Sequence, residues 1–252
     1  MCCLHIATDH RPDEVVEYIP LKTGSIAEFY IKPMLPHVGD IDLMYHANTQ
    51  LAIPRGHPPP TQLPAEFHNY VRVAEIIGSH LPGYAYLPIR YLLTQCADDD
   101  KYNYTEYDKG LYLLNPNDAN DVRNTHGPAV FTDWSQTDRL SIDAVPCVRC
   151  LSWPLQAADW PTRHRNYGWP DSATLDRVAS NGCDVVPLAH RLCRQDEWMG
   201  EHQWRLSFSR AEIVLINSWM PVQQMVYHMQ RYYLTRSSAI AGRPCDAKAC
   251  QG

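Results

Sequence analysis

The chain has 252 residues and a net charge of −6, with 45% hydrophobic and 20% charged residues. This length and balance are those of a globular protein with a real core, and the acidic charge gives no overall attraction to nucleic acid or anionic lipid. The sequence has no apolar run long enough for a transmembrane helix and no signal-peptide pattern at its start. Nine scattered cysteines indicate reduced thiols, so we expect a cytoplasmic protein.

The first predicted elements are a strand that ends in a Gly-Ser turn and, after a segment of mixed signals, a second strand. The strand pattern EYIPLKT ends at Gly24 and Ser25, and a second strand is predicted over 41–47 (IDLMYHA). Because strand side chains alternate, Asp40 and Asp42 point to one face. Two carboxylates so close repel one another unless a cation or hydrogen-bond donors lie between them. A lone D-x-D pattern is more often an exposed edge or a turn, so its interpretation depends on partners elsewhere.

The middle of the chain alternates loops with short regular segments. The proline-rich residues 51–64 predict a loop, residues 83–93 (GYAYLPIRYLL) predict extended chain, and the polar residues 95–110 predict a surface insertion. The spacing of five apolar residues predicts a helix from Glu66 onward: Phe67, Tyr70, Val71, Ala74 and Ile77.

Three more strands and a helix are predicted in the second half. Alternation predicts strands over 139–148 (RLSIDAVPCV), 183–190 (CDVVPLAH) and 204–209 (WRLSFS). A helix is predicted to begin at Ser172 and to end at Gly182.

Two helices are predicted after the last strand. Ser209 and Glu212 have the spacing of a capping box, and a second helix is expected to begin near Pro221. Its apolar stripe predicts core packing: Val222, Met225, Val226, Met229 and Tyr233. Periodicity is lost after Leu234, which predicts a disordered tail over 235–252.

A third acid supplies the partner that the D-x-D pattern needs. Asp143, like Asp40 and Asp42, has apolar neighbours that face the other way. If the two strands are neighbours, three carboxylates can converge, and such a set holds two Mg²⁺ ions for nucleotidyl transfer. A Gly-Ser turn would offer backbone donors to a phosphate.

The order of these motifs resembles the nucleotidyltransferases that include cyclic GMP-AMP synthase, the cyclic GMP-AMP synthase-like receptors and the male-abnormal (Mab) twenty-one-like proteins. The resemblance covers residues 18–234, and WRLSFSRAE is its most specific motif. The other motifs are TGSIAEFY, GDIDLMY, HGPAV, SIDAVPCVRC, WPLQAADWPTRHRNYGWP and NGCDVVPLAH. The resemblance implies an α+β nucleotidyltransferase fold, a mixed central sheet flanked by helices, with the helical second lobe mostly missing.

The same resemblance implies a role for each candidate residue. Asp40, Asp42 and Asp143 match the metal-binding and catalytic acidic triad, for Mg²⁺ or Mn²⁺. Residues that match nucleotide-binding positions are Gly24 and Ser25, on the phosphates, with Arg205, Ser207 and Glu212. The capping-box spacing leaves a purely structural role open for Glu212.

The chain also departs from the family. No zinc-binding insertion lies between Ser209 and Leu234, and with the acidic charge this makes double-stranded DNA an unexpected partner; RNA is the candidate activator. By resemblance, residues 1–234 form a Mab-type nucleotidyltransferase lobe, incomplete at both ends. Its exposed helix faces would be available to a protein partner.

Two functions follow. The first is a metal-dependent nucleotidyltransferase that makes a cyclic dinucleotide second messenger from nucleoside triphosphates such as ATP and GTP, in innate immune signalling. The alternative is a catalytically inactive Mab-type interaction or regulatory protein, because a fold alone does not fix a function.

Overall fold

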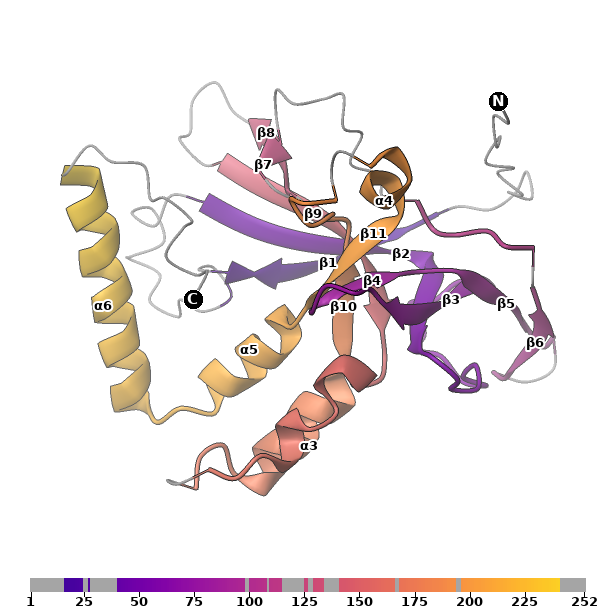
Figure 1. The fold of residues 1–252 in the computed structure, drawn as a ribbon. Helices are drawn as coiled ribbons and strands as arrows, with labels where there is room; N and C mark the ends of the chain where they lie inside the picture. The colour runs from indigo at the N-terminus through magenta and orange to yellow at the C-terminus, as the bar shows by residue number, and fades with distance from the viewer. Residues whose placement is uncertain are drawn as a thin grey trace.

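The computed structural model describes residues 16–24, 27, 40–97, 100–107, 109–114, 125–126, 129–133, 141–165, 168–193 and 196–240. Within these ranges eleven strands join in one mixed sheet (Figure 1). The strands are β1 (Tyr18–Thr23), β2 (Asp40–Pro54), β3 (Tyr70–Gly78), β4 (Tyr84–Tyr86), β5 (Ile89–Gln95), β6 (Tyr102–Glu106), β7 (Thr125–His126), β8 (Ala129–Asp133), β9 (Ser141–Cys150), β10 (Cys183–Val186) and β11 (Gln203–Ser207). The helices are η2 (Leu155–Ala157), η3 (Trp160–Thr162), α3 (Ser172–Asn181), α4 (Glu197–His202), α5 (Ser209–Asn217) and α6 (Pro221–Ile240). The predicted mixed sheet with flanking helices is thus present.

The long strand β2 organises the sheet. The strand order is β1-β2-β3-β4-β11-β10-β9-β8-β7, with β5 between β3 and β6, and β2 also pairs with β9. A shift in the β2–β9 register falls between His46 and Leu51. Before the shift β2 lies between β1 and β9, and after it β2 also pairs with β3 in parallel. The irregularity therefore divides β2 between two parts of the sheet.

The main core lies on the sheet face away from the predicted acids. Val148, Cys150, Cys183 and Val185 of β9 and β10 belong to one buried apolar cluster with Trp204 of β11. The indole Nε1 of Trp204 donates to the Leu113 carbonyl at 3.1 Å, which holds the segment after β6 over this cluster. Burial of aromatic and aliphatic side chains supplies most of the free energy that stabilises such a sheet.

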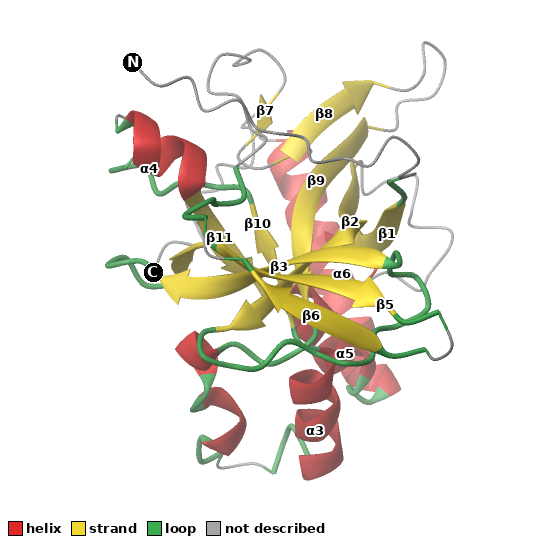
Figure 2. Ribbon diagram, turned by 90° about the vertical axis from the view of Figure 1, so that its right-hand side faces the viewer, coloured by secondary structure: helices red, strands yellow, loops and turns green. Residues whose placement is uncertain are grey.

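Helix α3 confirms the predicted start and end signals. Asp171 caps it by accepting a hydrogen bond from the Thr174 backbone N–H at 2.7 Å, and Gly182 ends it with φ of 65°. A Cβ at Gly182 would lie 2.8 Å from the Leu151 carbonyl carbon, so only glycine fits. Helices α3 and α5 lie side by side below the sheet, whereas α4 lies at the opposite end (Figures 1 and 2).

The helix predicted from Glu66 is wrong, because this segment forms strand β3. Val71, Val73 and Ala74 are fully buried, and β3 pairs with β2 on one side and with β4 and β5 on the other. A strand that is covered on both faces carries apolar residues at nearly every position. That density also satisfies helical spacing, which misled the prediction. The polar segment 95–110, predicted as a surface insertion, contains strand β6, whose residues after Tyr102 are exposed.

The predicted capping box is also wrong. Helix α5 begins at Ser209 itself, with Phe208 in the cap position and without a side-chain cap. The backbone N–H of Glu212 donates to the Phe208 carbonyl at 3.0 Å, as in an ordinary first helical turn. The fold therefore does not use Ser209 as the N-cap of α5.

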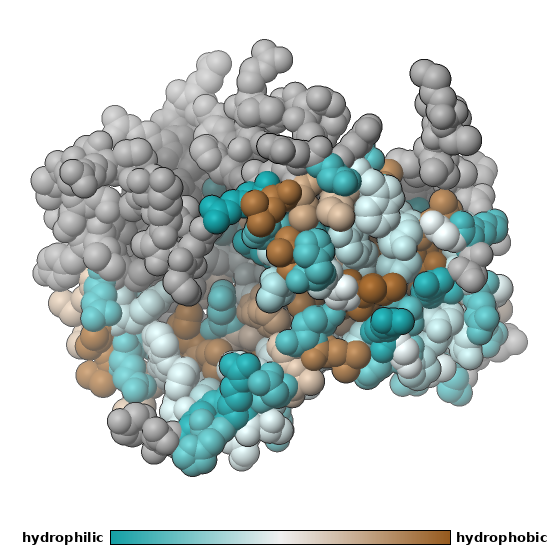
Figure 3. All heavy atoms as spheres, in the orientation of Figure 1, coloured by the Kyte–Doolittle hydropathy of each residue, from teal (hydrophilic) through white to brown (hydrophobic). Residues whose placement is uncertain are grey.

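Helix α6 does not bury the predicted stripe. The exposed fractions of Val222, Met225, Val226 and Met229 are 57%, 49%, 50% and 49%, and apolar atoms of this helix reach the surface at the left of Figure 3. The side chain of Tyr233 lies outside the described residues. The helix runs to Ile240, so the expected boundary at Leu234 falls inside it. Among the described helices, α6 included, none has both the length and the apolarity to cross a membrane.

Candidate active site

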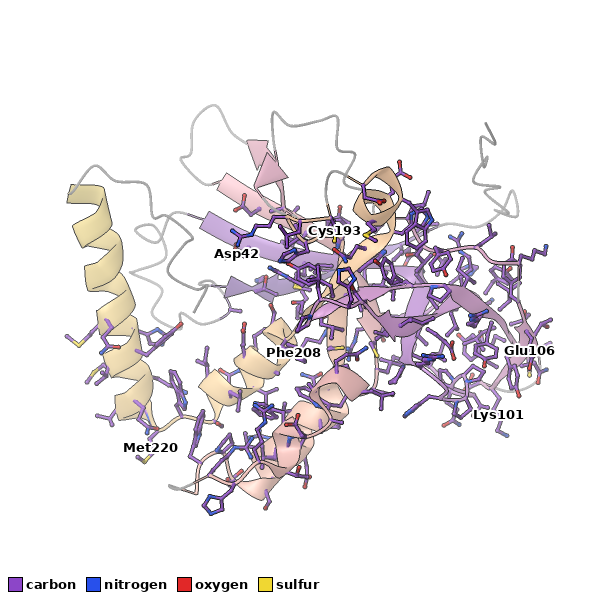
Figure 4. The ribbon with its side chains drawn as sticks, in the orientation of Figure 1. Asp42, Lys101, Glu106, Cys193, Phe208 and Met220 are labelled. Carbon is purple, nitrogen blue, oxygen red and sulfur yellow. The ribbon has the colours of Figure 1, made fainter. Side chains whose placement is uncertain are left out.

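Asp42 and Asp143 lie opposite one another on neighbouring parallel strands. The register of β2 and β9 pairs Asp42 with Asp143 and Asp40 with Ser141. Adjacent strands are about 4.8 Å apart, and directly paired residues point to the same face. Both carboxylates are half-buried, and Figure 4 labels Asp42 on β2. The structure thus brings together two acids that are far apart in the sequence.

Gly24 lies directly against the carboxylate of Asp42. The last residue of β1, Thr23, pairs with Asp42, and Gly24 follows with φ of 57°. A Cβ added to Gly24 would overlap Oδ2 of Asp42 and would lie 2.7 Å from its Cγ. A side chain at this position would therefore displace the carboxylate, and the positive φ independently favours glycine.

The remaining members of the predicted phosphate and metal site are only partly described. Asp40 occupies the β2 position paired with Ser141, on the same strand as Asp42. Its side chain and the whole of Ser25 lie outside the described residues. In the described part of the chain, no three side chains of His, Cys, Asp or Glu gather as metal ligands.

The carboxylate oxygens of Asp42 and Asp143 are suitable ligands for a hard divalent cation. Mg²⁺ is commonly held by one or two carboxylates together with substrate phosphates, and Mn²⁺ accepts the same oxygen ligands. Asp42 and Asp143 supply such carboxylates from one sheet face. Because Gly24 has no Cβ, the Asp42 carboxylate can lie directly against the backbone of this residue. The residues present therefore fit this kind of ion.

Apolar side chains follow the two acids along the strands. Met44, Cys147 and Val186 form a buried cluster, with Leu21 and Val145 packed against it. Met44 and Val145 are the next residues on the face of Asp42 and Asp143. Low-dielectric surroundings strengthen the attraction of carboxylates for a cation. Cys147 is a buried free thiol, and Cys150 is another, buried in the main core.

Strand β11 brings Ser207 to this same face. The Oγ of Ser207 lies 3.8 Å from the sulfur of Met44 and 3.3 Å from Oγ of Ser209. Arg205 is exposed and pairs with Val186, which belongs to the cluster beside the acids. Glu212 is exposed on the first turn of α5. Ser207 thus lies close to the strand that carries Asp42, whereas the side chains of Arg205 and Glu212 are exposed.

A buried ion pair that the sequence analysis did not single out lies next to Ser207. Nε of Arg210, on α5, donates to Oδ2 of Asp184, on β10, at 2.7 Å, and the Asp184 side chain is 0% exposed. Asp184 pairs with Ser207 on one side and with Arg149 on the other. An acid in the otherwise apolar stretch CDVVPLAH was the available signal, because buried carboxylates need a partner.

The neighbours of this pair are titratable and buried. Burial, and then the positive charge of Arg210, lowers the pKa of His46. Burial, and then the negative charge of Asp184, raises the pKa of the Cys147 thiol well above its usual value. The guanidinium of Arg149 binds backbone carbonyls, with Nη1 donating to the Cys183 carbonyl oxygen at 2.8 Å. Both His46 and Cys147 are therefore uncharged at neutral pH.

Comparison with protein families places these features in context. Residues 90–218, just over half of the 252 residues, match the model of the Mab-21 protein nucleotidyltransferase domain. The match includes Asp143, Arg205, Ser207 and Glu212. Strand β2 lies before it, and the β2–β9 register joins Asp42 to the matched part. The chain belongs to the Mab-21 nucleotidyltransferase domain family.

Proposed function

We propose that this chain carries a metal-dependent nucleotidyltransferase site built on Asp40, Asp42 and Asp143. The observation that carries the proposal is the direct pairing of Asp42 with Asp143, with Gly24 against the Asp42 carboxylate. Two carboxylates of like charge side by side favour a cation or hydrogen-bond donors between them, and membership of a nucleotidyltransferase family favours a metal ion in that place.

Each residue has a defined task in this proposal. Asp42 and Asp143, with Asp40, hold Mg²⁺ or Mn²⁺, which supplies positive charge to the reacting phosphates. The turn at Gly24 and Ser25 binds the triphosphate through backbone N–H groups. A hydroxyl of the acceptor nucleotide attacks the α-phosphorus, the bond to pyrophosphate breaks, pyrophosphate leaves with the electron pair, and the hydroxyl proton passes to water. The chain aligns these groups, which is the main contribution of an enzyme to such a transfer.

The finer proposal concerns substrates and product. Arg205, Ser207 and Glu212 contact the nucleotides, ATP and GTP are the substrates, and the product is a cyclic dinucleotide that acts in innate immune signalling in the cytoplasm. RNA is the proposed activator. Support comes from the position of Ser207 beside Met44 on the strand of Asp42 and from the family match that includes these three residues.

Product formation tests the proposal. Purified protein is incubated with labelled ATP, GTP, CTP and UTP and either Mg²⁺ or Mn²⁺, with and without double-stranded RNA, and the products are separated by chromatography. We expect a labelled product resistant to phosphatase that is lost in Asp143→Asn and unchanged in Asp159→Asn, since Asp159 is exposed in the loop between η2 and η3. Absence of product under all conditions, from protein that melts cooperatively, would falsify the enzymatic proposal.

A regulatory protein without catalytic activity is the alternative. The exposed apolar stripe of α6 favours it, because large exposed apolar patches are typical of interaction surfaces. The same assay separates the two functions, since only the enzyme makes a product that depends on Asp143.

A further inference from the structure

The buried pair of Arg210 and Asp184 links α5 to the sheet at the level of Ser207. The Arg210 side chain is 15% exposed and the Asp184 side chain 0%. Oδ1 of Asp184 has no hydrogen-bond partner at ordinary distance among the described residues, so the bond from Arg210 to Oδ2, with the nearby Cys147 thiol, is the support of this carboxylate. Arg149, the other nearby cation, donates to the carbonyls of Cys150, Cys183 and Asn181 instead.

Such a pair is a poor device for stability alone. Removing two charges from water costs much of what their attraction returns, and apolar residues of similar volume often stabilise a core as well or better. A buried pair instead fixes the relative position of its two side chains, because a short hydrogen bond between charged groups allows only a narrow range of geometries. The pair of Arg210 and Asp184 is therefore better explained as a device that positions α5 against the sheet.

The first turn of α5 is held by apolar packing together with Arg210, since Phe208 packs against the main core and Ala211 is buried. Its cap position is Phe208, without a side-chain cap, and the buried residues of the helix are Ala211 and Ile216. Arg210 is the second residue of the helix, and it is the residue whose side chain joins this turn to β10. Ser209 precedes it, and its hydroxyl lies 3.3 Å from that of Ser207.

The placement of this turn bears on the candidate active site. Asp184 is the register partner of Ser207, so the ion pair and the Ser207 hydroxyl lie side by side on adjacent strands. Ser207 in turn reaches Met44, the next residue after Asp42 on the same face of β2. A shift of α5 would move Ser209 and Glu212 relative to Asp42, and it would change the contact between the Ser209 and Ser207 hydroxyls.

We propose that Arg210, anchored by Asp184, is a positioning residue that sets α5 and the Ser207 hydroxyl relative to the acidic pair and so determines nucleotide affinity. This inference rests on the proposed nucleotidyltransferase function. It assigns no contact with substrate to Arg210. Its role is carried out through the β11–α5 junction, where Phe208 is labelled in Figure 4.

The test separates placement from stability and from metal binding. The double variant Asp184→Leu with Arg210→Met removes both charges, so no buried charge is left unpaired. We expect it to melt cooperatively and to bind Mn²⁺ as the wild type does, but to bind a fluorescent ATP analogue about tenfold more weakly, since small misplacements of contacting groups are costly. The matched control removes the exposed pair of Arg163 and Asp159, whose side chains are 60% and 68% exposed, and leaves the affinity unchanged.

A second comparison covers failure of the double variant to fold. Arg210→Lys keeps a cation that reaches Asp184 and retains most of the affinity, whereas Arg210→Gln loses about as much as the double variant. Equal affinities for wild type, Arg210→Lys and Arg210→Gln, or for wild type and the double variant, overturn the inference alone. If the wild type and Asp143→Asn show the same lack of metal-dependent binding, the proposed function fails, and the inference fails with it.

Discussion

Asp42 on β2 and Asp143 on β9 are direct partners in a parallel pair, and Gly24 closes against the Asp42 carboxylate from the other side. The acids therefore depend on one another through the sheet, although one lies inside the matched family region and the other before it. A substitution at any of these three residues is therefore expected to disturb the same candidate metal site.

The first prediction concerns metal affinity. Asp42→Asn removes one of two adjacent negative charges, so Mn²⁺ binding, followed by electron paramagnetic resonance, is expected to weaken by at least about tenfold. The stabilisation that metal gives, about 2.7 kcal/mol at 100 times the dissociation constant, falls by about 1.3 kcal/mol when the affinity falls tenfold at the same metal concentration. Asp159→Asn is the control, because Asp159 is exposed and pairs with Arg163 in a loop. Equal Mn²⁺ affinity in Asp42→Asn and wild type contradicts a metal role for Asp42.

The second prediction isolates the close approach at Gly24. Gly24→Ala must adopt a positive φ and also displaces Asp42, whereas Gly83→Ala faces only the strain of its φ of 80°, since nothing lies within 4 Å of an added Cβ. We expect Gly83→Ala to cost about 1–2 kcal/mol in urea unfolding and to leave Mn²⁺ affinity intact. Gly24→Ala should cost more and should also weaken Mn²⁺ binding. Identical behaviour of the two variants would show that the space at Gly24 is not used.

The third prediction is a pH dependence from His46. Its two ring nitrogens lack hydrogen-bond partners among the described residues. Its pKa is lowered first by burial and then by the charge of Arg210; Arg149 also lowers it, whereas Asp184 and Glu66 raise it. The unfolded chain, with an ordinary pKa of about 6.5, binds a proton below that pH when the folded chain does not. Stability is therefore complete above about pH 6.5 and falls as the pH is lowered toward the folded-state pKa.

His46→Leu removes this titration. We expect it to raise the free energy of unfolding by about 1 kcal/mol at pH 7.5, because a buried polar group without partners is lost, and by more at pH 5.5. His57→Leu, at an exposed position, should keep the slope of the wild type. Urea unfolding at the two pH values measures both effects, and equal slopes for His46→Leu and wild type count against a buried neutral His46.

The fourth prediction concerns thiol reactivity. Cys147 is buried and its pKa is raised by burial and by the charge of Asp184, so it carries little of the reactive thiolate. Cys96 is partly exposed. Brief alkylation with iodoacetamide at pH 8, read by peptide mass spectrometry, should label Cys96 well before Cys147, and urea should abolish the difference. Native labelling of both at one rate contradicts the burial of Cys147.

Local patterns predicted the strands of the site but not their pairing. Alternation around Asp42 and Asp143 defines both strands and the face of each acid. The β2–β9 register joins segments far apart in the chain, and no local propensity fixes such a contact. For the same reason the partner of Asp184 could not be predicted, although an acid in an apolar strand indicated that one was needed.

The helix predicted from Glu66 and the burial predicted for the apolar stripe of α6 were both wrong because tertiary packing decided them. Val71, Val73 and Ala74 are buried because β3 lies inside the sheet, and apolar residues in such density fit helix and strand alike. Met225 and Met229 have helical spacing, and α6 does form, but amphipathic spacing does not say whether a surface covers the stripe.

The most direct test of the central claim is Mg²⁺-dependent nucleotide binding, followed as the thermal shift caused by ATP and GTP in wild type and Asp143→Asn. The account predicts that each nucleotide raises the melting temperature of the wild type only with Mg²⁺, and that chelation or Asp143→Asn removes the shift. A wild-type protein that melts cooperatively and shows no shift, or one that Asp143→Asn leaves unchanged, would contradict the claim that the paired acids form a nucleotide site.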